Sequence, residues 1–156
     1  MPARRFFILA AEKAIRQVSR LRSKNSSFEI SLIFVIKREM RRLNRLYRGK
    51  NRPTDVLSFP RFAPGARPGR ALQKLGRIVP MADPDGVIRL GEIVIAPEVA
   101  RKEAAMFGNS VGKHYLFLFA HGSLHLLGYD HEKSKREEKE MFVLQRSIIE
   151  QITKNK

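Results

Sequence analysis

Hydrophobic and polar positions follow two distinct periods along this chain. Apolar residues spaced three and four apart predict helices over residues 4–22, 37–48, 97–107, 111–127 and 133–151. Alternation with a period of two predicts strands over residues 28–36, 54–59 and 87–95. Strict alternation in the last strand places Leu90 and Ile93 on opposite faces. The pattern therefore predicts an α+β fold with a small mixed sheet and about five helices.

Glycine and proline mark the boundaries of these elements. Gly49 and Gly128 are placed to end helices, because glycine tolerates the left-handed conformation found there. Residues 61–86 form a long loop rich in proline, glycine and arginine, for which a basic flap over bound RNA and a mobile linker both stay open. The helix over 111–127 is apolar almost all round, so we expect it to be buried.

The charge balance narrows the classes of partner. Among 156 residues, 31 lysines and arginines face 15 aspartates and glutamates, a formal net charge of +16. Such an excess favours a polyanion, since each neutralised phosphate releases counterions. The chain has no cysteine, which excludes disulfide partners, a thiolate zinc site and a thiol nucleophile. No apolar run is long enough for a membrane span, and we expect a cytoplasmic protein.

Three of the four histidines lie within the stretch His121-Gly-Ser-Leu-His125-Leu-Leu-Gly-Tyr-Asp-His131. His121 and His125 are four residues apart, so a helix projects them from one face. A helix end at Gly128 lets the chain turn His131 back towards them. Three imidazoles with an open fourth position suit catalytic zinc, although copper, nickel and iron also bind imidazole. The stretch predicts a metal site, whereas His114 is expected to be a core residue.

The spacing H-x3-H-x5-H is the zinc-binding layout of metzincin-like proteases, with one departure. In those enzymes a glutamate directly follows the first histidine and acts as general base. Gly122 occupies that position here, so the carboxylate that activates water in a protease is missing. Asp130 remains, either as a base or as a hydrogen-bond partner that orients a histidine.

Three blocks together resemble the YbeY family of bacterial endoribonucleases, which act in ribosomal RNA maturation and ribosome quality control. The blocks are the histidine stretch, Tyr47-Arg-Gly-Lys-Asn-Arg-Pro-Thr-Asp-Val-Leu-Ser-Phe-Pro60, and Leu90-Gly-Glu-Ile-Val-Ile95. They occur in the family's order. The resemblance implies a single domain over residues 1–156, with a fold resembling that of zincin-like metalloproteases.

The same resemblance implies a site and a reaction. One Zn²⁺ per chain would be held by His121, His125 and His131. Arg48 would hold the scissile phosphate, for which a planar guanidinium is suited because it binds two oxygens at once. The implied activity is a zinc-dependent, single-strand-specific endoribonuclease in 16S rRNA 3′-end maturation and ribosome quality control. Its partner would be ribosomal RNA in the small ribosomal subunit.

Four further arginines fall on one face of the helix over 37–48: Arg38, Arg41, Arg42 and Arg45. Their mutual repulsion is relieved when an anion meets them, so this face is a candidate RNA-binding surface, although a solvated face has the same pattern. Two alternatives to the enzyme stay open. One is a metallohydrolase of another substrate class, and the other is a ribosome assembly factor whose zinc is structural.

Overall fold

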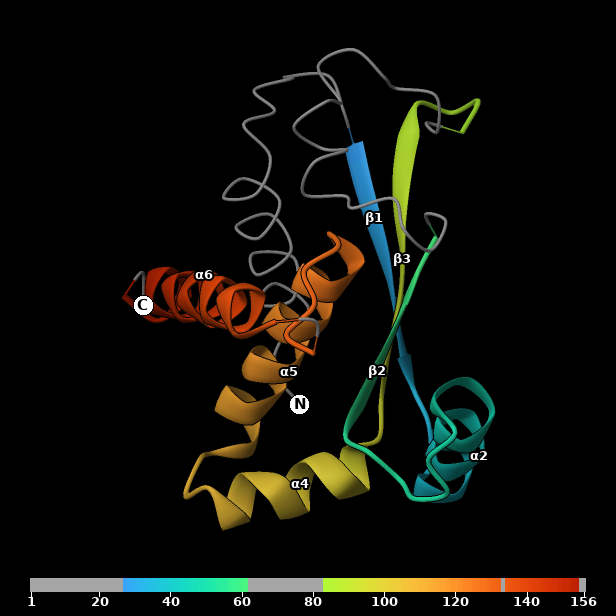
Figure 1. Ribbon diagram of the computed structural model, residues 1–156, viewed down its shortest axis with the longest axis vertical. Coiled ribbons are helices and arrows are strands. Elements are labelled where there is room, and N and C mark those ends of the chain that lie inside the picture. Colours follow the sequence, from blue (N-terminus) through green and yellow to red (C-terminus); the bar gives the residue numbers. More distant parts are fainter. Residues whose placement is uncertain (1–26, 62–82, 133, 155–156) are drawn as a thin grey trace.

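The computed structural model describes residues 27–61, 83–132 and 134–154. Three strands, β1 (Ser27–Phe34), β2 (Val56–Pro60) and β3 (Val87–Ile95), form one sheet in the order β1-β3-β2. β1 runs parallel to β3, and β2 runs antiparallel to it. The described ranges also contain four helices, α2 (Lys37–Arg48), α4 (Pro97–Met106), α5 (Val111–Leu126) and α6 (Lys135–Lys154) (Figure 1).

The predicted α+β class with a small mixed sheet is confirmed. Four of the five expected helices lie within the described residues, so the count of about five is slightly too high for this part of the chain. The expected helix over 4–22 lies outside the described residues, as does most of the predicted 61–86 loop.

A β-bulge in β3 overturns the predicted strict alternation of that strand. Two successive residues of β1 pair with Arg89 and Gly91, so Leu90 is an extra residue in the ladder. An extra residue shifts the pleat by one position. Leu90 and Ile93 consequently lie in the same core, which the sheet shares with α5 and α6.

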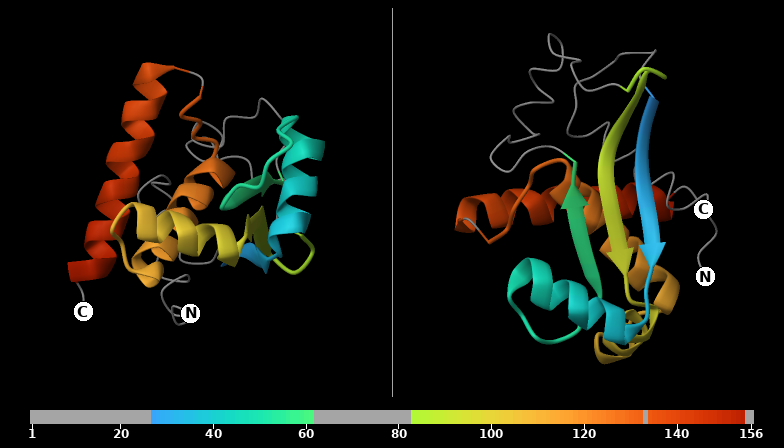
Figure 2. Two further views of the ribbon diagram at one scale, coloured as in Figure 1. Left: turned by 90° about the horizontal axis from the view of Figure 1, so that it is seen from below. Right: turned by 90° about the vertical axis from the view of Figure 1, so that its right-hand side faces the viewer.

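The opposite face of the sheet carries α2. Met40 of this helix is fully buried in a smaller core with Leu57 and Val94. Figure 2 shows α2 and α6 on opposite sides of the sheet. Asn44, one turn after Met40, is also buried, and its Nδ2 donates to the carbonyl oxygen of Arg52 at 2.7 Å. That bond fixes the loop between α2 and β2.

α5 crosses the other face of the sheet and is the most buried of the described helices, as its apolar sequence predicts. Ser110 caps its first turn by accepting a hydrogen bond from the N–H of Lys113. Leu118, Leu124 and Leu126 are almost fully enclosed. No helix of the described ranges is long and apolar enough to cross a membrane.

Candidate metal centre

The end of α5 and the turn behind it are shaped by Gly128. Its φ of 89° is the left-handed conformation predicted for it. The N–H of Gly128 donates to the carbonyl of His125, and the N–H of Tyr129 donates to that of Leu124. This pair of bonds is a Schellman motif, which closes the helix and reverses the chain. The reversal carries His131 back to the last two turns of α5.

The three histidines converge as the sequence predicts. Their ring nitrogens can supply one ligand atom each, all within 4.8 Å of one another. Nε2 of His121 and Nε2 of His125 are 3.1 Å apart. Two nitrogens bound to one tetrahedral zinc at about 2.0–2.1 Å lie roughly 3.3 Å apart, so these two already stand at nearly the required distance. The cluster could therefore hold one metal ion.

Gln145 of α6 orients His121, and sequence reasoning missed it. The side chain of Gln145 is 2% exposed, and its Oε1 lies 3.1 Å from Nδ1 of His121. An amide oxygen only accepts, so Nδ1 carries the proton and Nε2 presents its lone pair to the centre of the cluster. A partner of this kind selects the tautomer that binds metal. No pattern in the sequence marks one buried glutamine among the polar residues of a charged helix.

Burial keeps two of the imidazoles neutral. Burial, together with the charges of His121 and His131, lowers the pKa of His125 to about 4. Burial also lowers the pKa of His121, partly offset by its hydrogen bond to Gln145. Protonated imidazole cannot bind a metal ion, so these shifts favour metal binding at neutral pH.

Gly122 lies where α5 packs closely against the sheet. A Cβ atom placed there would be 3.0 Å from both Cδ1 of Ile93 and Oγ of Ser58. The position that holds the general base in metzincin-like proteases is thus packed against β2 and β3. A larger residue at this point would require Ile93 or Ser58 to shift.

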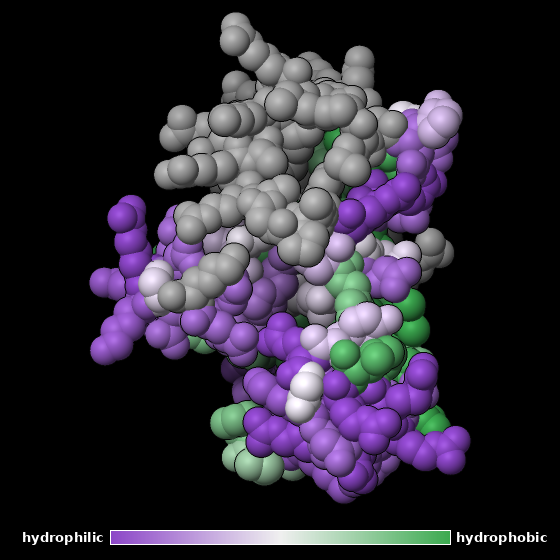
Figure 3. Space-filling model, turned by 45° about the vertical axis from the view of Figure 1, so that its right-hand side comes forward, coloured by the Kyte–Doolittle hydropathy of each residue, from purple (hydrophilic) through white to green (hydrophobic). Residues whose placement is uncertain are grey.

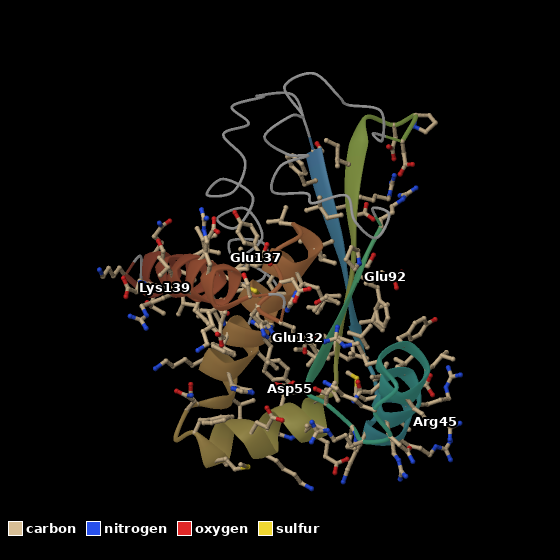
Figure 4. All side chains as sticks on the ribbon, in the orientation of Figure 1. Arg45, Asp55, Glu92, Glu132, Glu137 and Lys139 are labelled. Atoms are coloured by element: carbon tan, nitrogen blue, oxygen red, sulfur yellow. The ribbon has the colours of Figure 1, made fainter. Side chains whose placement is uncertain are left out.

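Arg48 reaches the turn that carries His131. Its Nη2 donates to Oε1 and Oε2 of Glu132, at 3.3 and 3.4 Å. Figure 4 shows Glu132 between α5 and the sheet. The N–H of Glu132 donates in turn to Oδ1 of Asp130 at 3.0 Å, which holds this turn in shape. Arg48 thus contacts the residue that directly follows His131.

The arginines of α2 divide into two pairs. Arg42 donates to Glu39 at 2.6 Å, and Arg41 donates to Oδ1 of Asn51 at 3.0 Å. Arg38 and Arg45 are exposed and have no hydrogen-bonding or ion-pair partner among the described residues. Figure 4 shows Arg45 on the side of α2 that faces away from the sheet, and Figure 3 shows a largely hydrophilic surface over this end of the molecule.

A three-histidine cluster at the end of a buried helix, in an α+β domain, defines a protein with a candidate single-metal centre. A family model described as Endoribonuclease YbeY matches residues 5–153. The chain belongs to the YbeY endoribonuclease family.

Individual relatives agree with this assignment. The chain is 39% identical to the endoribonuclease YbeY of Halalkalibacterium halodurans, over 79% of this chain and 71% of the relative. It is 38% identical to that of Geobacillus thermodenitrificans, over 88% and 81%. It is also similar to the solution structure of TM1509 from Thermotoga maritima, with 29% identity, a TM-score of 0.55, and coverage of 95% of this chain and 81% of that one.

Proposed function

We propose that this protein is a zinc-dependent, single-strand-specific endoribonuclease that acts in 16S rRNA 3′-end maturation and ribosome quality control. The observation that carries the proposal is the convergence of His121, His125 and His131 beside Arg48, in a member of the YbeY family with a net charge of +16. We take residues 1–156 as one catalytic domain, which a family match over residues 5–153 supports. The setting of such an activity is the cytoplasm.

The donor set favours zinc as the metal. Three neutral imidazoles with room for a further ligand are typical of catalytic zinc sites. The hydrogen bond from Nδ1 of His121 to Gln145 leaves Nε2 free to bind. One bound zinc ion per chain would supply Lewis acidity and activate water for attack on the phosphodiester.

The remaining groups bind and position the RNA. Arg48 would exchange its contact with Glu132 for the scissile phosphate and stabilise the charge that develops on phosphorus. Arg38 and Arg45, exposed and without a hydrogen bond or ion pair among the described residues, would bind neighbouring phosphates, with Arg41 and Arg42 beside them. The substrate would be ribosomal RNA in the small ribosomal subunit.

Two other functions remain as alternatives. A peptidase would lack its usual base, because Gly122 occupies the position of the catalytic glutamate. A ribosome assembly factor with structural zinc would use the same arginines without cleaving RNA. The assembly factor and the enzyme can be distinguished by measurement. If the zinc is structural, loss of a histidine should unfold the domain.

The deciding experiment compares wild-type protein with His125→Ala on end-labelled single-stranded and double-stranded RNA. Both proteins are purified identically and checked by circular dichroism, with Lys139→Ala, an exposed position of α6, as the control. We expect wild type and Lys139→Ala to cleave single-stranded RNA, and a folded His125→Ala to be inactive. Equal cleavage by all three would indicate a contaminating nuclease. If none cleaves free RNA, activity on small subunits and on 70S ribosomes decides between the enzyme and the assembly factor.

A further inference from the structure

A second cluster of metal-binding side chains lies at the other end of α5. Asp55 precedes β2, Glu103 lies on α4, and His114 lies on the first turn of α5. One ligand atom from each falls within 4.8 Å of the others. Figure 4 shows Asp55 where the start of β2 meets α4 and α5. His114 is buried as predicted, with a side chain only 5% exposed.

The nitrogen of His114 that faces the carboxylates has no hydrogen-bond partner. Its Nε2 is buried and lies 3.7 Å from Oδ2 of Asp55 and 3.9 Å from Oε2 of Glu103. These separations are too long for hydrogen bonds. They are shorter than about 4.2 Å, which is twice a metal–ligand bond of roughly 2.1 Å. The three atoms are therefore spaced like ligands around one ion.

The charges at this cluster are also unbalanced. Oδ1 of Asp55 accepts from the N–H of Val56 and the hydroxyl of Thr54, which holds the carboxylate with Oδ2 directed to the cluster. Among the described residues neither carboxylate forms an ion pair with lysine or arginine. Burial, a hydrogen bond to Asp55 and the charge of Asp55 together raise the pKa of Glu103 to about 7. A cation would relieve this repulsion.

We propose that Asp55, Glu103 and His114 form a second divalent-cation site, which takes Zn²⁺ or Mn²⁺. Two carboxylate oxygens and one imidazole nitrogen suit both ions. The side chain of Glu103 is 34% exposed, which leaves a route for the ion from solvent. This site joins the start of β2, α4 and α5.

The site acts on the fold and not on the reaction. His114 and His121 are seven residues apart on α5, a rise of about 10 Å. Paired catalytic ions lie roughly 3.5–4 Å apart, so the two sites do not form one binuclear centre. An ion here would stabilise the native state by binding it and not the unfolded chain.

Metal stoichiometry tests the proposal. The full chain, stripped with a chelator, is titrated with Zn²⁺ and separately with Mn²⁺ by isothermal calorimetry. We expect wild type to bind two equivalents of at least one ion, and Glu103→Gln and His125→Ala to bind one each. Glu98→Gln, an exposed position on the same helix, is the matched control and should keep both.

Thermal unfolding gives a second readout. His125→Ala should gain several degrees in Tm when the second site fills, and His125→Ala combined with Glu103→Gln should gain nothing. The proposal is overturned if His125→Ala binds neither ion, or if Glu103→Gln still binds two equivalents. The first of these results would mean that a proton in the hydrogen bond between Glu103 and Asp55 balances the two carboxylates without a metal ion. His125→Ala lacks the histidine site and RNA cleavage is not measured, so a failure of the second site can be distinguished from a failure of the proposed function.

Discussion

Arg48 and Glu132 are 84 residues apart in sequence and form a contact beside the histidine cluster, with Nη2 of Arg48 3.3 Å from Oε1 of Glu132. Glu132 directly follows His131, so this contact links α2 to the candidate metal centre. The side chains are 46% and 53% exposed, and such pairs contribute less than about 1 kcal/mol to stability. We therefore infer that the contact positions Arg48 and adds little to the stability of the fold.

Arg48→Ala should lower kcat on single-stranded RNA by about 10²–10³-fold, because a phosphate-binding cation is lost in the transition state. The Tm should change little. Arg48→Lys should restore only part of the rate, since an ammonium cannot bind two oxygens in one plane. Steady-state kinetics of the Arg48 variants and of Arg45→Ala give kcat and KM for each. We expect Arg45→Ala to affect mainly binding. A loss of Tm in step with the loss of rate would assign Arg48 to the fold.

Gln145→Leu should weaken zinc binding by about 10–100-fold, because His121 loses the acceptor that selects its tautomer. Folding should be retained, since Nε2 of Gln145 is buried without a partner in the native protein. Competition with a chromophoric chelator measures the affinity. Gln151→Leu, a half-buried position on the same helix, is the control. Unchanged zinc affinity in folded Gln145→Leu would remove this role from Gln145.

Gly122→Ala should destabilise the protein by about 1–3 kcal/mol, because its Cβ would meet Ile93 and Ser58 at 3.0 Å. Gly112→Ala is the matched control on the same helix, where nothing lies within 4 Å of the new Cβ. That change should stabilise by roughly 0.5–1 kcal/mol through helix propensity. Urea denaturation of both variants gives the comparison. Equal effects of the two substitutions would contradict the close approach of α5 to the sheet.

The metal-free protein should lose stability as the pH falls from about 6.5 towards 4. The pKa of His125 is lowered to about 4 by burial, while in the unfolded chain it lies near 6.5. The unfolded state therefore binds more protons in this window, and the contribution of His125, complete above pH 6.5, declines by about 3 kcal/mol.

His125→Gln isolates this effect, because glutamine does not titrate. Urea denaturation in the presence of a chelator, at pH 7.5 and pH 4.5, should show a larger drop for wild type than for the variant. Parallel curves for the two proteins would show that His125 ionises alike in the folded and unfolded states.

Arg38→Ala and Arg45→Ala should weaken binding to RNA of any sequence, since phosphate contacts carry no base information. Each should also reduce the slope of log Kd against log salt by about 0.7, the value for one phosphate of a single strand. Arg42→Ala is the comparison and should have a smaller effect, because its guanidinium is already paired with Glu39 at 2.6 Å. Each substitution is combined with His125→Ala for the binding measurement, so that the RNA is not cleaved. An equal effect of Arg42→Ala would show that pairing with Glu39 does not matter.

Local patterns were sufficient for much of this protein. The bounds of α2 and β3 agree with the periodicity, and Gly128 ends α5 in the predicted conformation. The three histidines could be found from spacing alone, because helix geometry and one glycine place them together within eleven residues. The resemblance to the YbeY family rested on equally local blocks.

The sequence by itself determined what depends on neighbours along the chain: the helices, the candidate metal ligands and the charge. Tertiary structure alone decided which distant residues meet them. The packing of segments far apart in sequence brings Gln145 into contact with His121 and Arg48 into contact with Glu132. The pairing of β1 with β3 likewise makes Leu90 an extra residue in the ladder. Periodicity records which face of an element is buried, but not which partner it is buried against, because that depends on how whole elements pack together.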